Sequence, residues 1–358
     1  MLPQKTCLGY TLIIIGSFGS MFLMIKVAIV GASGYAGAEL CRLISRHSHL
    51  ELSGLFVSAR SEDQGKLISD LYGNLKSICD LPLEPLTDAN TLIGRADAVF
   101  LATDHKVSHD LAPALVAANI AVFDLSGAFR ISDPEVFAKA YGFEHEHLDL
   151  LKTAVYALGE YVDVKALQNT HMISLPGCYP TASQLGLRPL IDHDFLDKAF
   201  CPVIDAVSGV SGAGRKAKLT NSFCEVSLNA YGVFTHRHSP EICEHLGTKV
   251  IFTPHLGNFK RGIHATITCK LKAGVTAEQV IAAFESAYAH KSLVRFNSQV
   301  LPKLANVQNT PFCDLGVKVA DGYVVVCSCI DNLLKGASAQ ALQILNLYYG
   351  FKETEALI

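Results

Sequence analysis

Cys178 is the residue of this chain with the clearest opportunity for covalent chemistry. It stands in the segment 176–181, Pro-Gly-Cys-Tyr-Pro-Thr, where an apolar run ends, the chain turns and a helix is expected to begin. A thiol at a helix N-terminus faces free backbone N–H groups and the positive end of the helix dipole, which both favour the thiolate. The dipole contributes only about 0.3–1 kcal/mol, so a thiol with an ordinary pKa of about 8.5 would stay mostly protonated at pH 7. A base or a cation must therefore lie nearby, unless Cys178 is one of the buried cysteines common in protein cores.

Two imidazoles, a guanidinium and a carboxylate lie within six positions in the second half of the chain. They belong to His236, Arg237, His238 and Glu241. Imidazole is suited to moving protons near neutral pH, which contributes about 10²–10⁴-fold to a rate, and it would stabilise a neighbouring thiolate. Pro240 predicts a helix that begins at Glu241, whose carboxylate could orient an imidazole. A polar cap at a surface helix would have the same composition.

A glycine-rich turn follows the first apolar run and precedes a helical stretch. Its glycines, Gly31, Gly34 and Gly37, have the spacing GxxGxxG rather than GxGxxG. Glycines at such a turn allow close backbone approach to a pyrophosphate that rests on a helix N-terminus. The turn therefore predicts a dinucleotide site, with a purely structural turn as the alternative.

The next apolar run ends at Ser58 and Arg60 and has no carboxylate at its tip. NAD sites usually place an acidic residue there to bind the ribose hydroxyls. Ser58 and Arg60 could instead hold a 2′-phosphate, which favours NADPH, although Arg60 could also be a solvated loop charge. A second small-residue loop at 208–215 ends in Arg215 and suits a phosphate or carboxylate, or is a flexible hairpin loop.

These candidates need a scaffold, and apolar runs alternate with helical stretches from residue 26 to residue 125. This alternation is typical of a parallel sheet covered by helices. After Cys178 longer strands with partial alternation are expected at residues 203–207, 222–228 and 264–271, as in an antiparallel sheet. Helices are expected at 275–289, with Thr276 as cap, and at 331–349, ending at Gly350. The predicted class is α/β: a Rossmann-type parallel-sheet nucleotide domain plus an α+β catalytic domain with a mainly antiparallel sheet.

Composition excludes several classes of protein. The 358 residues favour two domains, and a net charge of −3 offers no basic footprint for nucleic acid. The eleven cysteines form no CxxC pair, which indicates a reducing, cytoplasmic compartment without a disulfide framework or a metal site.

Residues 1–23 are expected to be an extension outside the fold. They contain an apolar stretch that could be a signal or a membrane anchor. The stretch is interrupted by glycine and serine, lacks a clear cleavage site and runs directly into the first strand, so we favour an upstream extension and expect no membrane association.

Six segments together resemble the N-acetyl-γ-glutamyl-phosphate reductase family, the NADPH enzymes of arginine biosynthesis. They are residues 31–37, 124–130, 176–181, 211–215, 236–241 and 331–337. The resemblance implies that Cys178 is the nucleophile, that His238 is the acid and base, and that Glu241 supports His238. It implies substrate contacts at Ser211, Arg215, His236 and Arg237. It implies contacts with NADPH at Gly31, Ser33, Gly34, Tyr35, Ala36, Gly37, Ser58, Arg60, Ser126 and Asn332.

The same resemblance implies a fold like the glyceraldehyde-phosphate and aspartate-semialdehyde dehydrogenases. The nucleotide domain would comprise residues 24–174 and 331–358, and the catalytic domain residues 175–330. The implied reaction reduces N-acetyl-L-glutamyl 5-phosphate through a Cys178 thioester, in a homo-oligomer that is a dimer or tetramer. Leu175, Ala128 and residues 257–259 depart from the usual family pattern, so no contact is assigned to them. A reductase of another acyl phosphate and a non-catalytic NADP(H)-binding protein are the alternatives.

Overall fold

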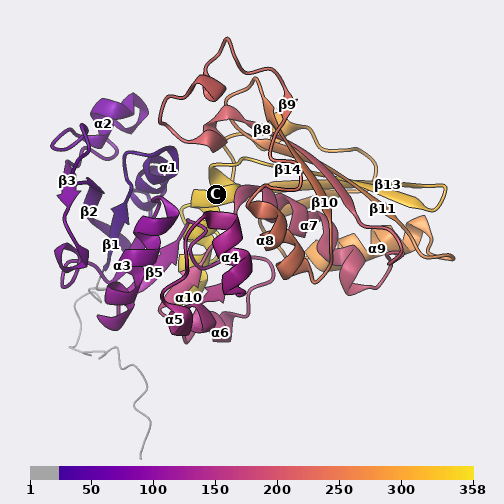
Figure 1. Ribbon diagram of the computed structural model, residues 1–358, viewed down its shortest axis with the longest axis horizontal. Helices are drawn as coiled ribbons and strands as arrows, with labels where there is room; N and C mark the ends of the chain where they lie inside the picture. The colour runs from indigo at the N-terminus through magenta and orange to yellow at the C-terminus, as the bar shows by residue number, and fades with distance from the viewer. Residues whose placement is uncertain (1–23) are drawn as a thin grey trace, which may run out of the picture.

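Two seven-stranded sheets organise the chain (Figure 1). The computed structural model describes residues 24–358, so the predicted extension at residues 1–23 lies outside the described residues. Within residues 24–358, none of the helices has the length and apolar character needed to cross a bilayer.

The first sheet is parallel throughout, as the alternation of apolar runs and helices predicts. Its spatial order is β3-β2-β1-β4-β5-β7-β6. The central strands are buried on both faces, and this explains their continuous apolar runs. The strands are β1 (Ile25–Val30), β2 (Leu50–Ser58), β3 (Leu83–Leu86), β4 (Ala98–Leu101), β5 (Ala121–Asp124), β6 (Val155–Tyr156) and β7 (Met172–Ser174).

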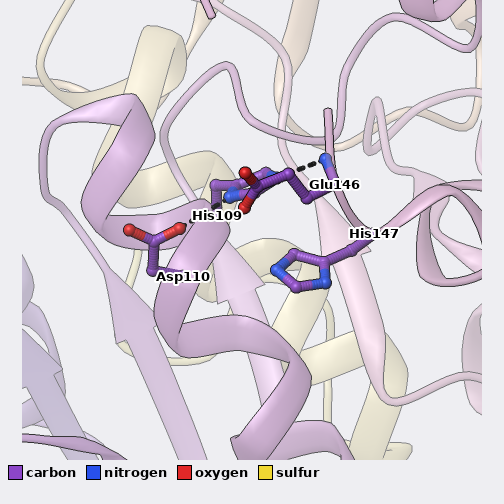
Figure 2. A group of neighbouring side chains, drawn as sticks. All are labelled: His109, Asp110, Glu146 and His147. Carbon is purple, nitrogen blue, oxygen red and sulfur yellow. Dashed lines mark hydrogen bonds and ion pairs between the residues drawn. The ribbon is translucent and has the colours of Figure 1, made fainter. Parts of the chain in front are cut away.

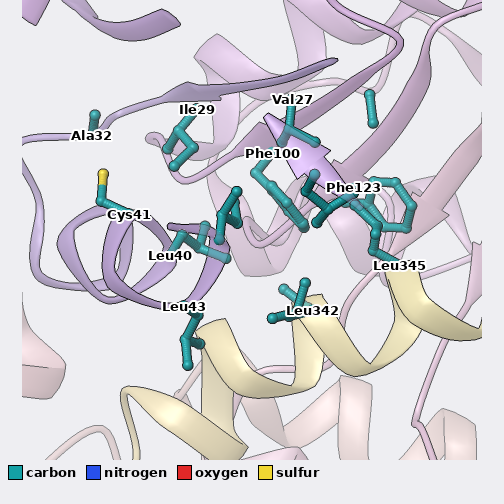
Figure 3. Close-up of a cluster of buried hydrophobic side chains, with 14 of the residues drawn as sticks. Val27, Ile29, Ala32, Leu40, Cys41, Leu43, Phe100, Phe123, Leu342 and Leu345 are labelled. Carbon is teal, nitrogen blue, oxygen red and sulfur yellow. The ribbon is translucent and has the colours of Figure 1, made fainter. Parts of the chain in front are cut away.

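Helices pack against this sheet, and the last helix of the chain contributes to the same buried core. In Figure 3, Leu342 and Leu345 of α10 (Ala339–Tyr349) point toward Leu40 of α1 and Phe123 of β5, and all four belong to one buried cluster. The helix ends at Gly350 in the left-handed conformation, as predicted, but it is preceded by a π-helical turn, η6 (Leu334–Ser338). The other helices of this half are α1 (Tyr35–Ile44), α2 (Ile68–Leu71), α3 (His105–Ala117), α4 (Pro134–Tyr141), α5 (Leu148–Thr153) and α6 (Val164–Gln168).

The second sheet is mixed and mostly antiparallel, in the order β12-β13-β14-β11-β8-β10-β9. Among the described strand pairs of this second sheet, only β8/β10 and β12/β13 are parallel. Buried and half-buried residues alternate along β11, because α7 packs on one face of the sheet. The strands are β8 (Val203–Gly209), β9 (Asn229–Ala230), β10 (Ile251–Gly257), β11 (Ile263–Lys270), β12 (Val294–Asn297), β13 (Cys313–Ala320) and β14 (Tyr323–Ile330).

The helices of this half are α7 (Cys178–Asp192), α8 (His238–Leu246) and α9 (Ala277–Tyr288). Thr276 caps α9 by accepting a hydrogen bond from the Gln279 N–H, as predicted. Short 3₁₀ turns complete the described chain: η1 (Gly73–Leu75), η2 (Ala89–Thr91), η3 (Val210–Ala213), η4 (Leu219–Asn221) and η5 (Leu304–Asn306).

The strand predicted at residues 222–228 is wrong. This segment is a looping excursion in which Phe223 is 91% exposed and Leu228 is 58% exposed. Its apolar residues resemble a strand pattern, but none of the strands in residues 24–358 pairs with the segment. The predicted fold class is confirmed, whereas the domain boundaries at 174/175 and 330/331 stay a prediction.

Candidate active site

A cleft of about 1220 Å³ lies between the two halves and brings distant segments together. Cys178 and His238 are sixty positions apart in the sequence, and both line this cleft. The base that the sequence requires near Cys178 is therefore available. The predicted site residues that line it are Gly34, Tyr35, Ala36, Gly37, Cys178, Ser211, Arg215, His236, Arg237, His238 and Asn332. The predicted residues outside this lining are Gly31, Ser33, Ser58, Arg60, Ser126 and Glu241.

Cys178 is the first residue of α7, with Gly177 as the N-cap. The side chain is half-buried, and this burial raises the pKa of the Cys178 thiol above its ordinary value. The Arg130 guanidinium, the Tyr179 N–H and Arg237 oppose that rise without overcoming it. The helix N-terminus therefore does not by itself make a thiolate here, and a base must take the proton when the sulfur attacks.

His238 is the first residue of α8 and is suited to be that base. Burial, together with the nearby charges of Arg130 and Arg237, holds the pKa of His238 well below its ordinary value, so the imidazole is neutral at pH 7. A Cβ placed on Gly177 would lie 2.6 Å from His238 Nε2, so only glycine fits between this ring and the turn that carries Cys178. Nδ1 of His238 is buried and has no hydrogen-bond partner within the described residues.

Glu241 holds the turn before Cys178 rather than the imidazole. One carboxylate oxygen accepts hydrogen bonds from the Gly177 N–H at 2.8 Å and the Tyr156 hydroxyl at 3.0 Å. The other lies 3.4 Å from the Arg130 guanidinium, and no hydrogen bond joins Glu241 to His238 in the described part of the chain. The helix begins at His238 instead of Glu241, so Glu241 is the fourth residue of α8. Its buried carboxylate therefore binds the Gly177 N–H instead of orienting His238.

Arg130 was missed as a functional residue by reasoning from the sequence. It is buried, and its guanidinium donates to the carbonyl oxygens of Leu175 and Leu125, each at 2.7 Å. These bonds tie the chain entering the Cys178 turn to the loop after β5. The available signal was its position at the end of the segment 124–130, one of the six that carry the family resemblance.

The glycine loop has the backbone geometry expected of an anion site. Gly31 has φ +84°, and a Cβ there would lie 2.2 Å from the Ala102 carbonyl oxygen. A Cβ on Gly37 would lie 2.5 Å from the Gly31 carbonyl oxygen. Glycine is therefore required at both positions for α1 to start close to the sheet edge, with Gly34 as N-cap and Tyr35 in the cleft.

Ser58, Arg60 and Ser126, which are predicted to contact the cofactor, are among the residues outside the cleft lining. Ser58 and Arg60 are exposed at the end of β2, where the Arg60 N–H donates to the Ser58 hydroxyl at 3.3 Å. Ser126 is buried, and its hydroxyl donates to the Asp124 carboxylate at 2.9 Å. The roles of Ser58 and Arg60 stay predictions, while the Ser126 hydroxyl is already used to shape the turn after β5.

The loop after β8 meets the start of η6. Asn332 donates to the Ser211 hydroxyl at 3.0 Å and accepts from the Gly262 N–H at 2.6 Å, so both side chains are held at the cleft. Arg215, which was predicted to contact substrate, forms an ion pair with Asp63 of the nucleotide half. Its guanidinium therefore links the two halves beside the glycine loop.

Figure 2 shows a group of side chains that could hold a metal ion: His109, Asp110, Glu146 and His147. His109 Nε2 accepts from the Glu146 N–H at 3.1 Å, so Nδ1 carries the proton and donates to Asp110 at 2.8 Å. Lys106 lies 2.8 Å from Asp110 and 3.5 Å from the Glu146 carboxylate. A metal would have to displace both this proton and this lysine, so the cluster is satisfied by its own charges.

Comparison with known proteins first defines the class. Residues 26–169 match the family model for the semialdehyde dehydrogenase NAD binding domain, and residues 178–332 match the semialdehyde dehydrogenase dimerisation domain. Aspartate semialdehyde dehydrogenase II from Vibrio cholerae, solved with ASA, has a TM-score of 0.69 at 16% identity, covering 91% of this chain and 98% of that one. The Candida albicans enzyme, solved with NADP, has a TM-score of 0.67 at 15% identity with the same coverage. The fold is that of the semialdehyde dehydrogenases.

Closer relatives define the family within this class. N-acetyl-gamma-glutamyl-phosphate reductase of Yersinia pestis is 58% identical over 337 residues, which are 94% of this chain and all of the relative. The protein of the same name in Escherichia coli K12 is 56% identical over 335 residues, again 94% of this chain and all of the relative. The chain belongs to the N-acetyl-gamma-glutamyl-phosphate reductase family.

Proposed function

We propose that this chain uses NADPH to reduce N-acetyl-L-glutamyl 5-phosphate to N-acetyl-L-glutamate 5-semialdehyde and phosphate, in arginine biosynthesis. The observation that carries the proposal is that Cys178 and His238 line one cleft, where burial raises the pKa of the thiol and lowers the pKa of the imidazole. That cleft also contains the N-terminus of α1 and its glycine loop, and the curated relatives bear the name of this reaction. The alternatives are a reductase of a different acyl phosphate and a non-catalytic nucleotide-binding protein.

The acylation step uses both side chains. His238 accepts the proton of the Cys178 thiol as the sulfur forms a bond to the γ-acyl carbon. The bond between that carbon and the phosphate oxygen breaks, phosphate leaves, and a thioester on Cys178 remains. An imidazole that is neutral before the step can take this proton, and the resulting imidazolium then holds it for the next step.

The reduction step converts the thioester to the aldehyde. When bound, NADPH would supply the hydride that reduces the thioester carbon. The imidazolium of His238 gives its proton to the oxygen, so that a hemithioacetal forms on Cys178. His238 then removes that proton, the carbon–sulfur bond breaks, and the thiolate is reprotonated as the aldehyde leaves.

We assign cofactor binding to the carboxyl ends of β1 and β2 in the parallel sheet. The glycine loop and the start of α1 would hold the pyrophosphate through backbone N–H groups. Ser58 and Arg60 would bind the 2′-phosphate from the end of β2, where both are exposed and free to approach it. Asn332, held by Ser211 and the Gly262 N–H, would contact the nicotinamide end.

The proposal is tested with purified protein and a panel of acyl phosphates. We expect NADPH oxidation with N-acetylglutamyl phosphate and little with aspartyl phosphate or aminoadipyl phosphate. Turnover of another acyl phosphate but not of N-acetylglutamyl phosphate would refute the substrate assignment.

Cys178→Ser tests the mechanism in the same assay. We expect it to abolish phosphate-dependent aldehyde oxidation while NADPH binding, measured by fluorescence titration, is unchanged. Cys201→Ser is the matched control, since Cys201 is exposed and lies outside the cleft lining. Activity of Cys178→Ser equal to that of the control would exclude a thioester on Cys178.

Assembly and location are further proposals. A dimer or tetramer is expected, and sedimentation analysis of the purified protein at assay concentration would test it. A cytoplasmic location is expected from the cysteine content, and cell fractionation would test it.

A further inference from the structure

His105 is an imidazole of the nucleotide half that lines the same cleft as Cys178. It is the first residue of α3 and lies just beyond the carboxyl end of β4, the neighbour of β1 in the sheet. Ligands of open parallel sheets bind beyond the carboxyl ends of the strands. His105 therefore approaches the cleft from the nucleotide side, whereas Cys178 and His238 begin helices of the other half.

The proton on this ring is fixed by its surroundings. Nδ1 accepts a hydrogen bond from the Gly127 N–H at 2.8 Å, and the ring packs edge-on against Tyr141 with 4.7 Å between centroids. Burial, together with Arg237 and Arg130, lowers the pKa of His105 to about 3, so the ring is neutral at pH 7. A neutral imidazole whose Nδ1 accepts must carry its proton on Nε2. Within residues 24–358, no hydrogen bond to this Nε2 occurs.

The Nε2–H donor of His105 lies in the cleft that Cys178 and His238 also line. His105 is held by Gly127, and the Arg130 N–H donates to the Gly127 carbonyl oxygen in the same turn. A Cβ placed on Gly177 would lie 2.8 Å from the Arg130 guanidinium and 2.6 Å from His238 Nε2, so this turn reaches the residue before Cys178. A neutral N–H held in one orientation can stabilise an oxygen as it becomes negative without itself losing a proton. In the reaction proposed above His238 transfers its proton, so a donor that keeps its proton throughout the reaction would have a separate role.

We propose that the Nε2–H of His105 donates a hydrogen bond to the carbonyl oxygen of the acyl group on Cys178. This inference rests on the proposed function, because the acyl group is the one formed in that reaction. His105 would then be a further catalytic residue, contributed by the nucleotide half to chemistry that takes place on the other half.

Two substitutions separate this role from a structural one. In His105→Asn the amide oxygen can still accept from the Gly127 N–H, but no donor remains at the position of Nε2. In His105→Gln the amide nitrogen can reach the position of Nε2, but the bond to Gly127 is lost. The two variants are compared with wild type for kcat, for NADPH Kd and for thermal unfolding.

We expect kcat to fall about 10²–10³-fold in His105→Asn, as when one oxyanion donor is removed, with NADPH Kd and thermal unfolding unchanged. We expect His105→Gln to retain kcat within about tenfold of wild type, although it loses the bond to Gly127. The reverse order, with His105→Asn close to wild type and His105→Gln impaired, would assign His105 to the structure of the Gly127 turn and overturn the proposal. A change confined to NADPH Kd would also overturn it.

The activity of the wild-type protein distinguishes a wrong substrate assignment from a wrong role for His105. If wild type fails to reduce N-acetylglutamyl phosphate, the substrate assignment is wrong, and the variants are compared with the acyl phosphate that wild type does reduce. The ratio between the two variants then still tests the donor role of His105.

Discussion

Gly336 lies directly behind the nucleophile, and adding one methyl group there tests how accurately Cys178 must be positioned. A Cβ on Gly336 would lie 2.7 Å from the Cys178 Cβ and 3.2 Å from its Cα. The first distance is about 0.7 Å shorter than the 3.4 Å at which ordinary contact begins. Cys178 Cβ is next to the backbone that starts α7, so the nucleophile has little freedom to rotate away.

The segment that carries Gly336 is anchored from both sides. Its neighbour Lys335 is completely buried, and its ammonium group is bound by the Glu160 carboxylate at 2.5 Å and the Gln343 side chain at 2.8 Å. Ser338, at the end of the π-helical turn, donates to the Ala36 carbonyl oxygen of the glycine loop at 2.8 Å. Because η6 cannot retreat without breaking these bonds, the new methyl group of Gly336→Ala must displace Cys178.

A displacement of about 1 Å can cost about 10²-fold in rate, so the 0.7 Å shortfall predicts a loss of kcat of about 10–100-fold in Gly336→Ala. This corresponds to about 1.4–2.7 kcal/mol in the activation free energy. The assay is steady-state NADPH oxidation, with NADPH Kd and the alkylation rate of Cys178 measured in parallel. We expect kcat and the alkylation rate to change while NADPH Kd stays within twofold of wild type.

Gly73→Ala is the matched control, since nothing lies within 4 Å of a Cβ at that position. The two variants add the same methyl group, but only one adds it against the nucleophile. If kcat of Gly336→Ala equals that of Gly73→Ala, the positioning argument is refuted. Overpacking can also destabilise a fold by about 1–3 kcal/mol, so thermal unfolding of both variants is measured to separate loss of folding from displacement.

Two further predictions concern the cofactor and acid stability. Arg60→Ala should raise the KM for NADPH by about 10–100-fold and leave the KM for NADH unchanged, because only NADPH carries the 2′-phosphate that Arg60 is proposed to bind; equal effects on both cofactors would contradict this. The free energy of unfolding should decrease as the pH is lowered from 6.5 toward 4. Burial lowers the pKa of His105 to about 3, and the pKa values of His145 and His236 to about 4, whereas in the unfolded chain they are about 6.5. Since the unfolded state binds more protons in this range, the loss is about 1.36 kcal/mol per pH unit for each imidazole, and at most about 4 kcal/mol per pH unit for all three. Urea unfolding at pH 7 and pH 5 measures this decrease in the free energy of unfolding. Equal stability at the two pH values would show that these rings are not held neutral.

The scaffold could be predicted because its signals are local. Fully apolar runs such as 98–101 indicate strands buried on both faces, and Thr276 followed by Gln279 indicates a capped helix. The glycine loop was also predictable, since a left-handed φ at Gly31 and the close packing at Gly37 both require glycine. Each of these features depends on a few consecutive residues, so no knowledge of distant contacts is needed.

The wrong strand at 222–228, the wrong start of α8 and the contacts that could not be predicted all depend on contacts between distant segments. Arg130 binds Leu175, and Arg215 binds Asp63 across the two halves, and neither partner can be identified from spacing. The segment 222–228 has strand-like residues, but a strand forms only where a neighbouring strand is free to pair, and no described strand pairs with this segment. Glu241 was predicted near the right group of residues, but a helix that begins three positions earlier directs its carboxylate to Gly177.

The protonation states of the two central side chains show most clearly how the structure changes the chemistry expected from sequence. A helix N-terminus and a nearby imidazole suggest a preformed thiolate–imidazolium pair. Burial acts against both charges, since it raises the pKa of Cys178 and lowers that of His238. The pair is therefore neutral before substrate binds, and the proton moves from sulfur to nitrogen only as the acyl carbon is attacked. The attack therefore depends on correct placement of both Cys178 and His238. Glycine at 177 and 336 permits this placement, because a Cβ there would lie 2.6 Å from His238 Nε2 and 2.7 Å from the Cys178 Cβ, respectively.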